Sequence, residues 1–285
     1  GVAITLVLTI GSASSGWLIV RIAIHTQGVL QAVATLALLA GLASALAARS
    51  LEHSVLNVIS ALPSNKNGDL SAAREKLGWI VGRDTTSLSR NEILRAAAET
   101  ASENAVDGLF APLFWMLVGA SLWSLGFSAS PGPLALAWAF KAASTLDSML
   151  GYRRGRLRWL GTAGARLDDL LTWLPCRLVM LSLPMVSKPI WQWPAMVIMA
   201  ESEGRHDASP NAGRSEAIYA HCAGVQLGGR NRYGDRWVDK PVLGSDYPSA
   251  DQKSVIRILG LTRRLELFWI LIAALLSWSL KRIAQ

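Results

Sequence analysis

The stretch RDTTSLSRNEILRAAAETASENAVDGLFAPLFW, Arg83–Trp115, decides what kind of chain this is. Ser89 and Glu92 have the Ser-x-x-Glu spacing of a capping box, so we expect a helix to begin near Arg90. Charged residues then follow at steps of three or four, a spacing that stacks side chains along one face of a helix. They are Glu92, Arg95, Glu99 and Glu103.

The predicted helix leads directly into an apolar segment. Asp107-Gly108 is expected to break the helical pattern, and the residues from Leu109 to Val118 carry no charge. Solvated helix faces usually mix charges of both signs and do not end at a membrane. We therefore interpret the carboxylates as a polar face that lies next to a membrane segment.

The composition indicates a membrane protein. Hydrophobic residues make up 51% of the 285 residues and charged residues 17%, whereas soluble domains carry roughly 25% charged residues. Residues 22–48 carry no formal charge, and this run is longer than the roughly 20 residues that cross a bilayer. The sequence predicts an all-α, polytopic integral membrane protein with about 4–6 membrane-embedded helices and cytoplasmic polar loops.

The expected organisation is one membrane domain that covers residues 1–285. Membrane helices at 1–48 are joined near Arg21 and His25, and a cytoplasmic helical segment follows at 49–104. A membrane hairpin and broken helices are expected at 105–200, a cytoplasmic polar loop at 201–264 and a C-terminal membrane helix at 265–285.

Smaller elements are expected inside these segments. Residues 51–62 and 70–77 have the pattern of short helices, separated by a turn at 63–69. The apolar run 170–200 is expected to be broken by the residues Pro175, Pro184, Lys188, Pro189 and Pro194.

The net charge of +8 follows from basic residues in the polar segments, among them a run within 151–169. This is the positive-inside pattern, so we expect these segments to face the cytoplasm of a bacterial inner membrane. The charge is explained by topology without a nucleic acid, and the alternative is attraction of an anionic substrate.

A predicted hairpin brings acidic groups to one membrane face. It consists of 109–127, a turn at 128–133 and a return arm that either continues from Leu134 through Lys141 to Met149 or is re-entrant. Carboxylates near phosphates suit Mg²⁺, and charges close to a bilayer core are usually functional. The acidic set is Glu99, Glu103, Asp107, Asp147, Asp168, Asp169, Glu201 and Glu203. The alternative is simple pairing, of Arg95 with Glu99 and of Arg166 with Asp169.

A second polar cluster is ESEGRHDASPNAG, residues 201–213. Arg205 and His206 suit a phosphate, and the backbone N–H groups of the turn can assist them. A hydrolase triad of Asp207, His206 and Ser209 is disfavoured, because neighbours in sequence rarely form one and the Gly-x-Ser-x-Gly elbow is missing. The glycines of GVQLGG (224–229) have no P-loop pattern, and turn geometry is the alternative to a ligand role.

Six motifs in order resemble the adenosylcobinamide-phosphate synthase (CobD/CbiB) family of cobalamin biosynthesis. They are VGRDT (81–85), EILRAAAETASENAVDGLFAPLFW (92–115), STLDSMLGY (144–152), ARLDDLLTWLPCRL (165–178), MAESEGRHDASPNAG (199–213) and GVQLGG (224–229). The resemblance implies a multi-pass membrane enzyme with a cytoplasmic active face. It implies ligation of the carboxyl of adenosylcobyric acid, a corrinoid, to the amine of aminopropanol phosphate or a related phosphorylated amino alcohol. ATP as co-substrate and Mg²⁺ are implied, with membrane lipid around the helices, and a homo-oligomer or cobalamin-assembly partners are compatible with it.

This reaction assigns expected roles to the polar residues. Glu99, Glu103, Asp107 and Asp147 are expected to be catalytic, and Glu103, Asp107 and Asp147 to bind the metal. Substrate and phosphate contacts are expected from Arg83, Asp84, Asn104, Arg166, Asp168, Asp169, Glu203, Arg205, His206, Ser209 and Asn211.

The chain departs from the family pattern at a few points. Ser144 stands where the family usually has Asn, and Cys176 stands where it has a small residue. We find no Asp-Pro or His-Pro motif before Arg49, so a further segment is expected ahead of Gly1. The alternative function is a non-catalytic membrane sensor of related ancestry. A transporter would place charges within its spans rather than at one face.

Overall fold

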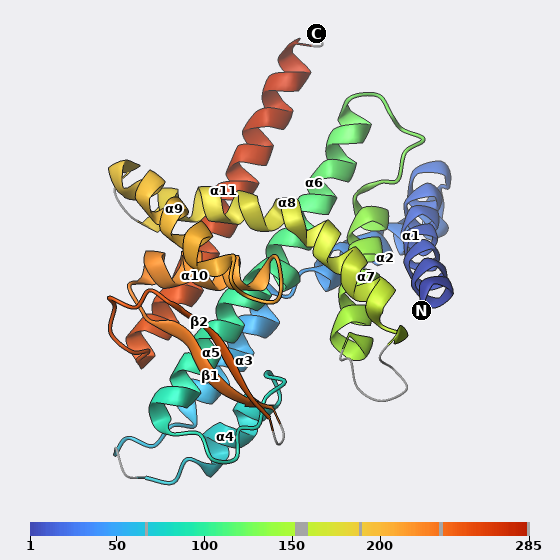
Figure 1. The fold of residues 1–285 in the computed structure, drawn as a ribbon. Coiled ribbons are helices and arrows are strands. Elements are labelled where there is room, and N and C mark those ends of the chain that lie inside the picture. Colours follow the sequence, from blue (N-terminus) through green and yellow to red (C-terminus); the bar gives the residue numbers. More distant parts are fainter. Residues whose placement is uncertain (66–67, 152–158, 188–189, 234–235, 284–285) are drawn as a thin grey trace. The chain divides into compact units, whose positions relative to one another are not determined.

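The computed structural model describes residues 1–65, 68–151, 159–187, 190–233 and 236–283, and this part of the chain is mostly helical (Figure 1). The chain forms two compact units. The first contains residues 1–47, 107–175 and 270–285, and the second contains residues 48–106 and 176–269. Each unit is described by itself.

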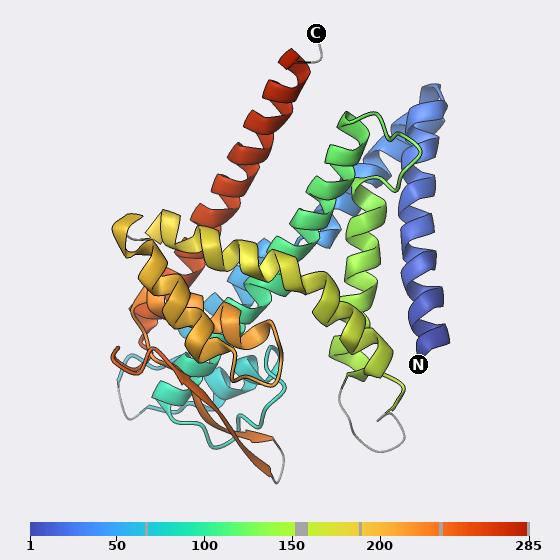
Figure 2. The same ribbon diagram turned by 45° about the horizontal axis from the view of Figure 1, so that its top comes forward.

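The first unit is built from helices that pack against one another. α1 (Val2–His25) packs against α2 (Gly28–Ala45) and α7 (Pro133–Leu150), and α7 also packs against α2 and α6 (Ala111–Ser124). Figures 1 and 2 both show α1 and α7 side by side. The helices approach closely because small residues lie between them. A Cβ on Gly16 would lie 3.0 Å from the Ala135 backbone, and one on Gly119 would lie 2.7 Å from Gly132.

The join between the first two helices lies at Thr26 and Gln27, so the expectation of a join at Arg21–His25 was wrong. Arg21 stays helical because its guanidinium donates to the Ser128 carbonyl at 2.9 Å and stacks on Trp17, 5.2 Å from the ring centroid. A long cationic side chain that reaches a partner in this way is tolerated at the end of an apolar helix.

The helix of the deciding stretch begins as expected. α5 (Arg90–Ala105) has a complete capping box between Ser89 and Glu92. The expected break at Asp107-Gly108 was wrong, because a π-helical turn, Val106–Phe110, carries the helix on into α6. A π turn leaves backbone groups without their regular partners. Here the Gly108 carbonyl accepts the Ala47 N–H at 2.8 Å.

The return arm of the hairpin continues through Lys141 to Leu150, which confirms the longer of the two predicted forms. α8 (Thr162–Ser187) is also continuous, so the expectation that Pro175 and Pro184 break it was wrong. At Pro175 the reason is visible. The Leu171 carbonyl, which loses its helical donor, accepts the Trp115 indole N–H at 3.1 Å.

The second unit surrounds α5. This helix packs against α3 (Ala48–Ser60), α4 (Ser71–Gly78), α10 (Ala212–Ala223) and β1 (Leu227–Tyr233). β1 pairs antiparallel with β2 (Arg236–Leu243), which also contacts α9 (Trp193–Gly204) and α10. Figures 1 and 2 show the hairpin against these helices. α11 (Gln252–Ile283) is joined to α10 by the Tyr219 and Thr262 hydroxyls, 2.8 Å apart.

The predicted short helices at 51–62 and 70–77 are confirmed as α3 and α4. The predicted polar loop 201–264 was wrong, because it contains the end of α9, all of α10, the β1–β2 hairpin and the start of α11. The last helix therefore begins at Gln252 rather than at residue 265. Parts of three predictions lie outside the described residues: the turn at 66–67, the basic run at 152–158 and the break at Lys188-Pro189.

Four helices in the described chain are long and apolar enough to cross a membrane. They are Val2–His25, Gly28–Ala45, Arg90–Ser124 and Thr162–Ser187. This confirms a mostly helical membrane protein.

Candidate functional site

The centre of the candidate site is Glu99 on α5. Its side chain is 1% exposed, and a buried carboxylate is costly unless charges and donors surround it. Arg83, from the loop before α5, forms an ion pair with Oε2. Oε1 accepts the Gly228 N–H at 2.9 Å and lies 3.6 Å from Arg95, one helical turn earlier. The pairing of Arg95 with Glu99, given above as the alternative to a functional role, is thus present.

Asn231 on β1 joins the two arginines. Its Oδ1 accepts from Arg83 at 2.5 Å and from Arg95 at 3.1 Å. Burial alone would lower the pKa of Arg83, but the Glu99 carboxylate outweighs it and raises the pKa above its usual value. Arg83 is therefore held as a cation against Glu99, and Asn231 fixes the positions of both guanidinium groups.

A β-bulge places the hairpin against these groups. Gly228 pairs with Val242 and Gly229 with Lys240, so Pro241 is the extra residue. Gly228 and Gly229 have φ values of 77° and 86°, which favour glycine. A Cβ on Gly228 would lie only 1.9 Å from the Pro241 carbonyl oxygen. Gly228 and Gly229 of the GVQLGG motif are thus explained by the backbone conformation of the bulge.

A second group of charges lies next to Glu99 in the same unit. Lys240 Nζ on β2 lies 3.1 Å from Glu216 Oε1 and 3.5 Å from Asp207 Oδ2, and the Glu103 carboxylate acts on it electrostatically. Glu216 is 1% exposed, and burial raises its pKa to about 8. Burial lowers the pKa of Lys240, but the three surrounding carboxylates outweigh this and raise it.

Glu203 contacts groups from two other elements of the second unit, and its expected role toward substrate stays a prediction. Its Oε2 is 3.0 Å from Nε2 of the buried His221 and accepts the Gly244 N–H at 2.8 Å. The His221 ring stands edge-on to Tyr247, with centroids 5.6 Å apart. Glu203 thus ties α9 to α10 and to the end of the hairpin.

The turn at 205–211 is held by its own polar groups. Asp207 accepts the Ser209 N–H at 2.9 Å, and the Ser209 hydroxyl accepts the N–H groups of Asn211 and Ala212 at 3.2 Å. Arg177 donates to Asn211 Oδ1 at 2.5 Å. Asn211 and Ser209 therefore shape the turn that carries Asp207.

Two arginines and a histidine border this turn. Arg214 binds both oxygens of Glu201 at 2.6 and 2.7 Å, and its hydrogen bonds lower the pKa of Glu201. Arg205 and His206 are exposed neighbours whose ring and guanidinium nitrogens are 3.5 Å apart. Their expected role toward a phosphate stays a prediction.

Two further predicted residues of the second unit are Asp84 and Asn104. Asp84 accepts the Thr86 N–H and hydroxyl, which lower its pKa, and lies 3.8 Å from Arg232. Asn104 is exposed on α5.

The first unit holds its own polar group. Lys141 on α7 lies within electrostatic reach of Asp107 and Asp168, and Asp147 within reach of Asp169. Asp168 is buried on α8, whereas Arg166 is exposed. The predicted catalytic and metal residues thus divide between the units, with Glu99 and Glu103 in the second and Asp107 and Asp147 in the first.

Oxygen ligands of this kind suit Mg²⁺ in type. Within the described chain, however, no three His, Cys, Asp or Glu side chains converge as a ready-made ion site. Glu103 and Asp107 each face a lysine instead. The metal assignment therefore stays a prediction.

Glu216, Lys240 and Asn231 were missed by the sequence patterns. A weak signal existed for Glu216, which stands in the otherwise small and apolar helix AGRSEAIYAHCA. Lys240 and Asn231 carry no such local signal, because only the bulged hairpin brings them to α5.

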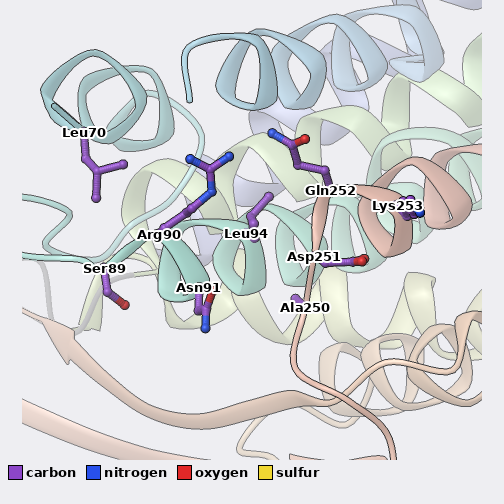
Figure 3. A pocket seen from close by; sticks show the side chains of 9 residues that line it. All are labelled: Leu70, Ser89, Arg90, Asn91, Leu94, Ala250, Asp251, Gln252 and Lys253. Atoms are coloured by element: carbon purple, nitrogen blue, oxygen red, sulfur yellow. The ribbon is translucent and has the colours of Figure 1, made fainter. Parts of the chain in front are cut away.

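Two cavities open beside α5. One of about 300 Å³ is lined by Arg95, Gly228 and Arg230 among others, so the arginine network borders a hollow. The other, of about 700 Å³, lies between the starts of α5 and α11 (Figure 3). There Arg90 and Gln252 extend on the same side, with Leu94 between them. Volumes of this size can hold a small molecule.

Comparison with known proteins adds the family. The family model described as "CobD/Cbib protein" matches residues 1–262. "Cobalamin biosynthesis protein CobD" of Synechocystis is 42% identical over 273 residues, which are 95% of this chain and 75% of the relative. A protein of the same name from Yersinia enterocolitica is 39% identical over 81% of this chain and 68% of its own length.

"Cobalamin biosynthesis protein CbiB" of Salmonella typhimurium is 40% identical over 79% of this chain. The matched region is 64% of that relative's length. No solved structure matches the chain.

Proposed function

Because the chain belongs to the CobD/CbiB family of cobalamin biosynthesis proteins, we propose that it is an amide ligase of that pathway. The proposed reaction joins the free carboxyl of adenosylcobyric acid to the amine of aminopropanol phosphate, or of a related phosphorylated amino alcohol, with ATP. The product is adenosylcobinamide phosphate. The proposed location is the bacterial inner membrane, with the active face in the cytoplasm.

The observation that carries the proposal is the buried charge network of the second unit. Four acidic and three basic side chains interact in this network, and they come from several elements of the second unit. The loop before α5, α5 itself, the turn before α10, α10 and the hairpin each contribute. The residues are Arg83, Arg95, Glu99, Glu103, Asp207, Glu216 and Lys240. Bringing this many charges out of water is costly, and such clusters concentrate at functional sites. A purely structural core of this size would use apolar side chains.

The proposed chemistry has two steps. The substrate carboxylate attacks the γ-phosphorus of ATP, which forms an acyl phosphate and releases ADP. The amine then attacks the acyl carbon, phosphate leaves, and the nitrogen loses a proton to a carboxylate. Glu103, half-buried at the edge of the network, is our choice for that base.

Cationic groups are needed where phosphate charge develops. Arg95 lines the cavity at Gly228 and shares Glu99 with Arg83, and Arg205 is exposed at the turn. When bound, Mg²⁺ would neutralise triphosphate charge, and carboxylate oxygens would be its ligands.

The decisive assay uses a version of the protein that includes any preceding segment, in detergent or lipid, with adenosylcobyric acid, aminopropanol phosphate, Mg²⁺ and ATP. We expect the amide product, together with ADP and phosphate. Labelled oxygen in the substrate carboxyl should appear in the released phosphate. Absence of product rejects the ligase, and product without label transfer rejects the acyl phosphate.

The variant Glu103→Gln tests the proposed base. We expect turnover to fall by about 10²–10⁴-fold while the unfolding transition stays in place, because a general base contributes on that order. Glu75→Gln is the control, since it makes the same chemical change at an exposed position of α4 outside the site. Full activity of Glu103→Gln would remove Glu103 from the site.

A further inference from the structure

The lysine of the second charge group is held in an unusual way. Lys240 Nζ lies between Glu216 Oε1 at 3.1 Å and Asp207 Oδ2 at 3.5 Å, and the Glu103 carboxylate also acts on it. These carboxylates come from α5, the turn before α10 and α10 itself. One compact cation thus interacts with three carboxyl groups from three segments.

A second observation shows that this cluster has unused binding capacity. Oε2 of Glu216 is buried and makes no hydrogen bond within the described part of the chain. Glu216 is 1% exposed, so water does not simply cover this oxygen. A buried carboxyl oxygen without a hydrogen-bond partner is costly, and it is expected where a ligand supplies the missing partner.

The geometry selects the chemistry of that ligand. An alkylammonium offers three N–H donors around a point charge, and the Lys240 ammonium already lies at the focus of the carboxylates. Mg²⁺ is disfavoured, because it needs oxygens at 2.0–2.1 Å in a regular octahedron. A guanidinium is disfavoured because its planar fork suits one carboxylate rather than three.

The lysine can leave without disturbing the core. Its side chain is 20% exposed, and the preceding β2 residues 236–239 are exposed. The Pro241 bulge gives Lys240 its position, because it lets Lys240 and Leu243 both face inward although they are three residues apart. The backbone of Lys240 thus belongs to an exposed strand at the edge of the unit, and only its side chain reaches the carboxylates.

We propose that Glu103, Asp207 and Glu216 form a subsite for a primary ammonium group, and that the Lys240 ammonium is a built-in competitor for it. The inference rests on the proposed function for the identity of the incoming amine, the phosphorylated amino alcohol. Lys240 then acts as a positioning residue. Its ammonium holds the carboxylates in place and is displaced when the substrate amine binds to them. One carboxylate accepts the proton whose loss frees the nitrogen lone pair for attack, and a second accepts the proton that the nitrogen loses as the amide forms.

The first test concerns the subsite alone and does not need turnover. Lys240→Ala removes the competitor, and we expect a lower unfolding temperature that ethylammonium raises in a concentration-dependent way. Tetramethylammonium at equal ionic strength should have no such effect, because it has no N–H donors. Wild type, Lys240→Met and the exposed Lys253→Ala should not respond. The double variant Lys240→Ala with Glu216→Gln should lose most of the response.

Equal stabilisation by both cations, or none by ethylammonium, overturns the subsite. If Lys240→Ala does not fold unaided, it is expressed and extracted with ethylammonium present. Recovery that depends on ethylammonium supports the subsite. Failure under both conditions, alongside normal recovery of Lys240→Met, counts against it.

The second test links the subsite to the amino alcohol. Calorimetric titration with aminopropanol phosphate should show at least about tenfold tighter binding to Lys240→Ala than to wild type, because the tethered competitor is gone. Propyl phosphate, which lacks the amine, should bind the two proteins equally. Equal affinities for the amino alcohol overturn the competition. A failed ligase assay with the ammonium response intact would instead reject only the proposed reaction.

Discussion

At the scale of single residues, Glu99 shows how a carboxylate is kept inside a protein. Arg83, Arg95 and the Gly228 N–H share its two oxygens, so the charge has donors on each side. Asn231 then fixes the directions of both guanidinium groups. Removal of any member leaves the others buried and mismatched, which costs more than the pair itself contributes.

Glu99→Gln should therefore be strongly destabilising. The amide keeps the shape but leaves two guanidinium groups without their anion, and breaking a buried pair costs about 3–5 kcal/mol. Denaturant unfolding of the detergent-solubilised protein measures this loss. Glu75→Gln, at an exposed position of α4, is the control and should change stability by less than about 0.5 kcal/mol. Equal effects of the two variants would contradict the network.

Glu216 predicts a dependence of stability on pH. Its pKa is about 8 in the folded chain and lower when unfolded, so between these values the folded state binds more protons. The stabilisation is complete at acidic pH and is lost as the pH rises through about 8, by an amount of the order of a few kcal/mol. Unfolding curves between pH 5 and 9 should show this fall in wild type and a smaller one in Glu216→Gln. Identical pH profiles would contradict it.

At the scale of elements, the helical pattern located the parts that local chemistry determines. The Ser89–Glu92 cap predicted the start of α5, and the spacing of Glu99 and Glu103 placed both on one face of that helix. The π turn and the continuous α8 were not predicted, because their stability depends on partners far along the chain. Ala47 satisfies the Gly108 carbonyl, and Trp115 the Leu171 carbonyl.

The hairpin makes a specific prediction about glycine. Gly228→Ala should destabilise the second unit by more than about 2 kcal/mol, because a Cβ would strike the Pro241 carbonyl and the backbone is left-handed there. Gly260→Ala is the matched control, since a Cβ at that exposed helical position meets nothing within 4 Å. It should be neutral or stabilising by about 1 kcal/mol. Thermal unfolding distinguishes the two, and a harmless Gly228→Ala would mean that the bulge is not needed.

The first unit predicts an equally local contrast within α1. Gly16→Leu should loosen the contact between α1 and α7, because its Cβ would already crowd the Ala135 backbone at 3.0 Å. Gly11→Leu should be tolerated, because nothing lies within 4 Å of that position. Thermal stability in detergent is the measurement. A ranking in the opposite order would contradict the packing of these helices.

At the scale of the whole molecule, the charge-free runs indicated a membrane protein, and four described helices are long and apolar enough to cross a bilayer. The protein should remain in the membrane fraction through an alkaline carbonate wash and dissolve only in detergent. A soluble protein from the same membranes should be released by the wash. Release of this chain under those conditions would contradict the spanning helices.

The whole site was less predictable than the membrane segments. Arg83, Glu99 and Glu103 followed from spacing and from the family motifs. Glu216, Lys240 and Asn231 join them through contacts between elements far apart in sequence, and the alternation of β2 is shifted by Pro241. Sequence patterns report local periodicity, so they cannot show which distant charges share one buried volume.

The Gly228 N–H has a practical consequence, because a carboxylate holds it rather than a strand neighbour's carbonyl. Its proton can exchange with heavy water only when the hydrogen bond to Glu99 opens. The hydrogen-exchange rate of this single amide therefore reports how often the Glu99 hydrogen bond opens. Substrate arrival, a change of protonation or the loss of an arginine would each be read as a change in its rate, without any label on the protein.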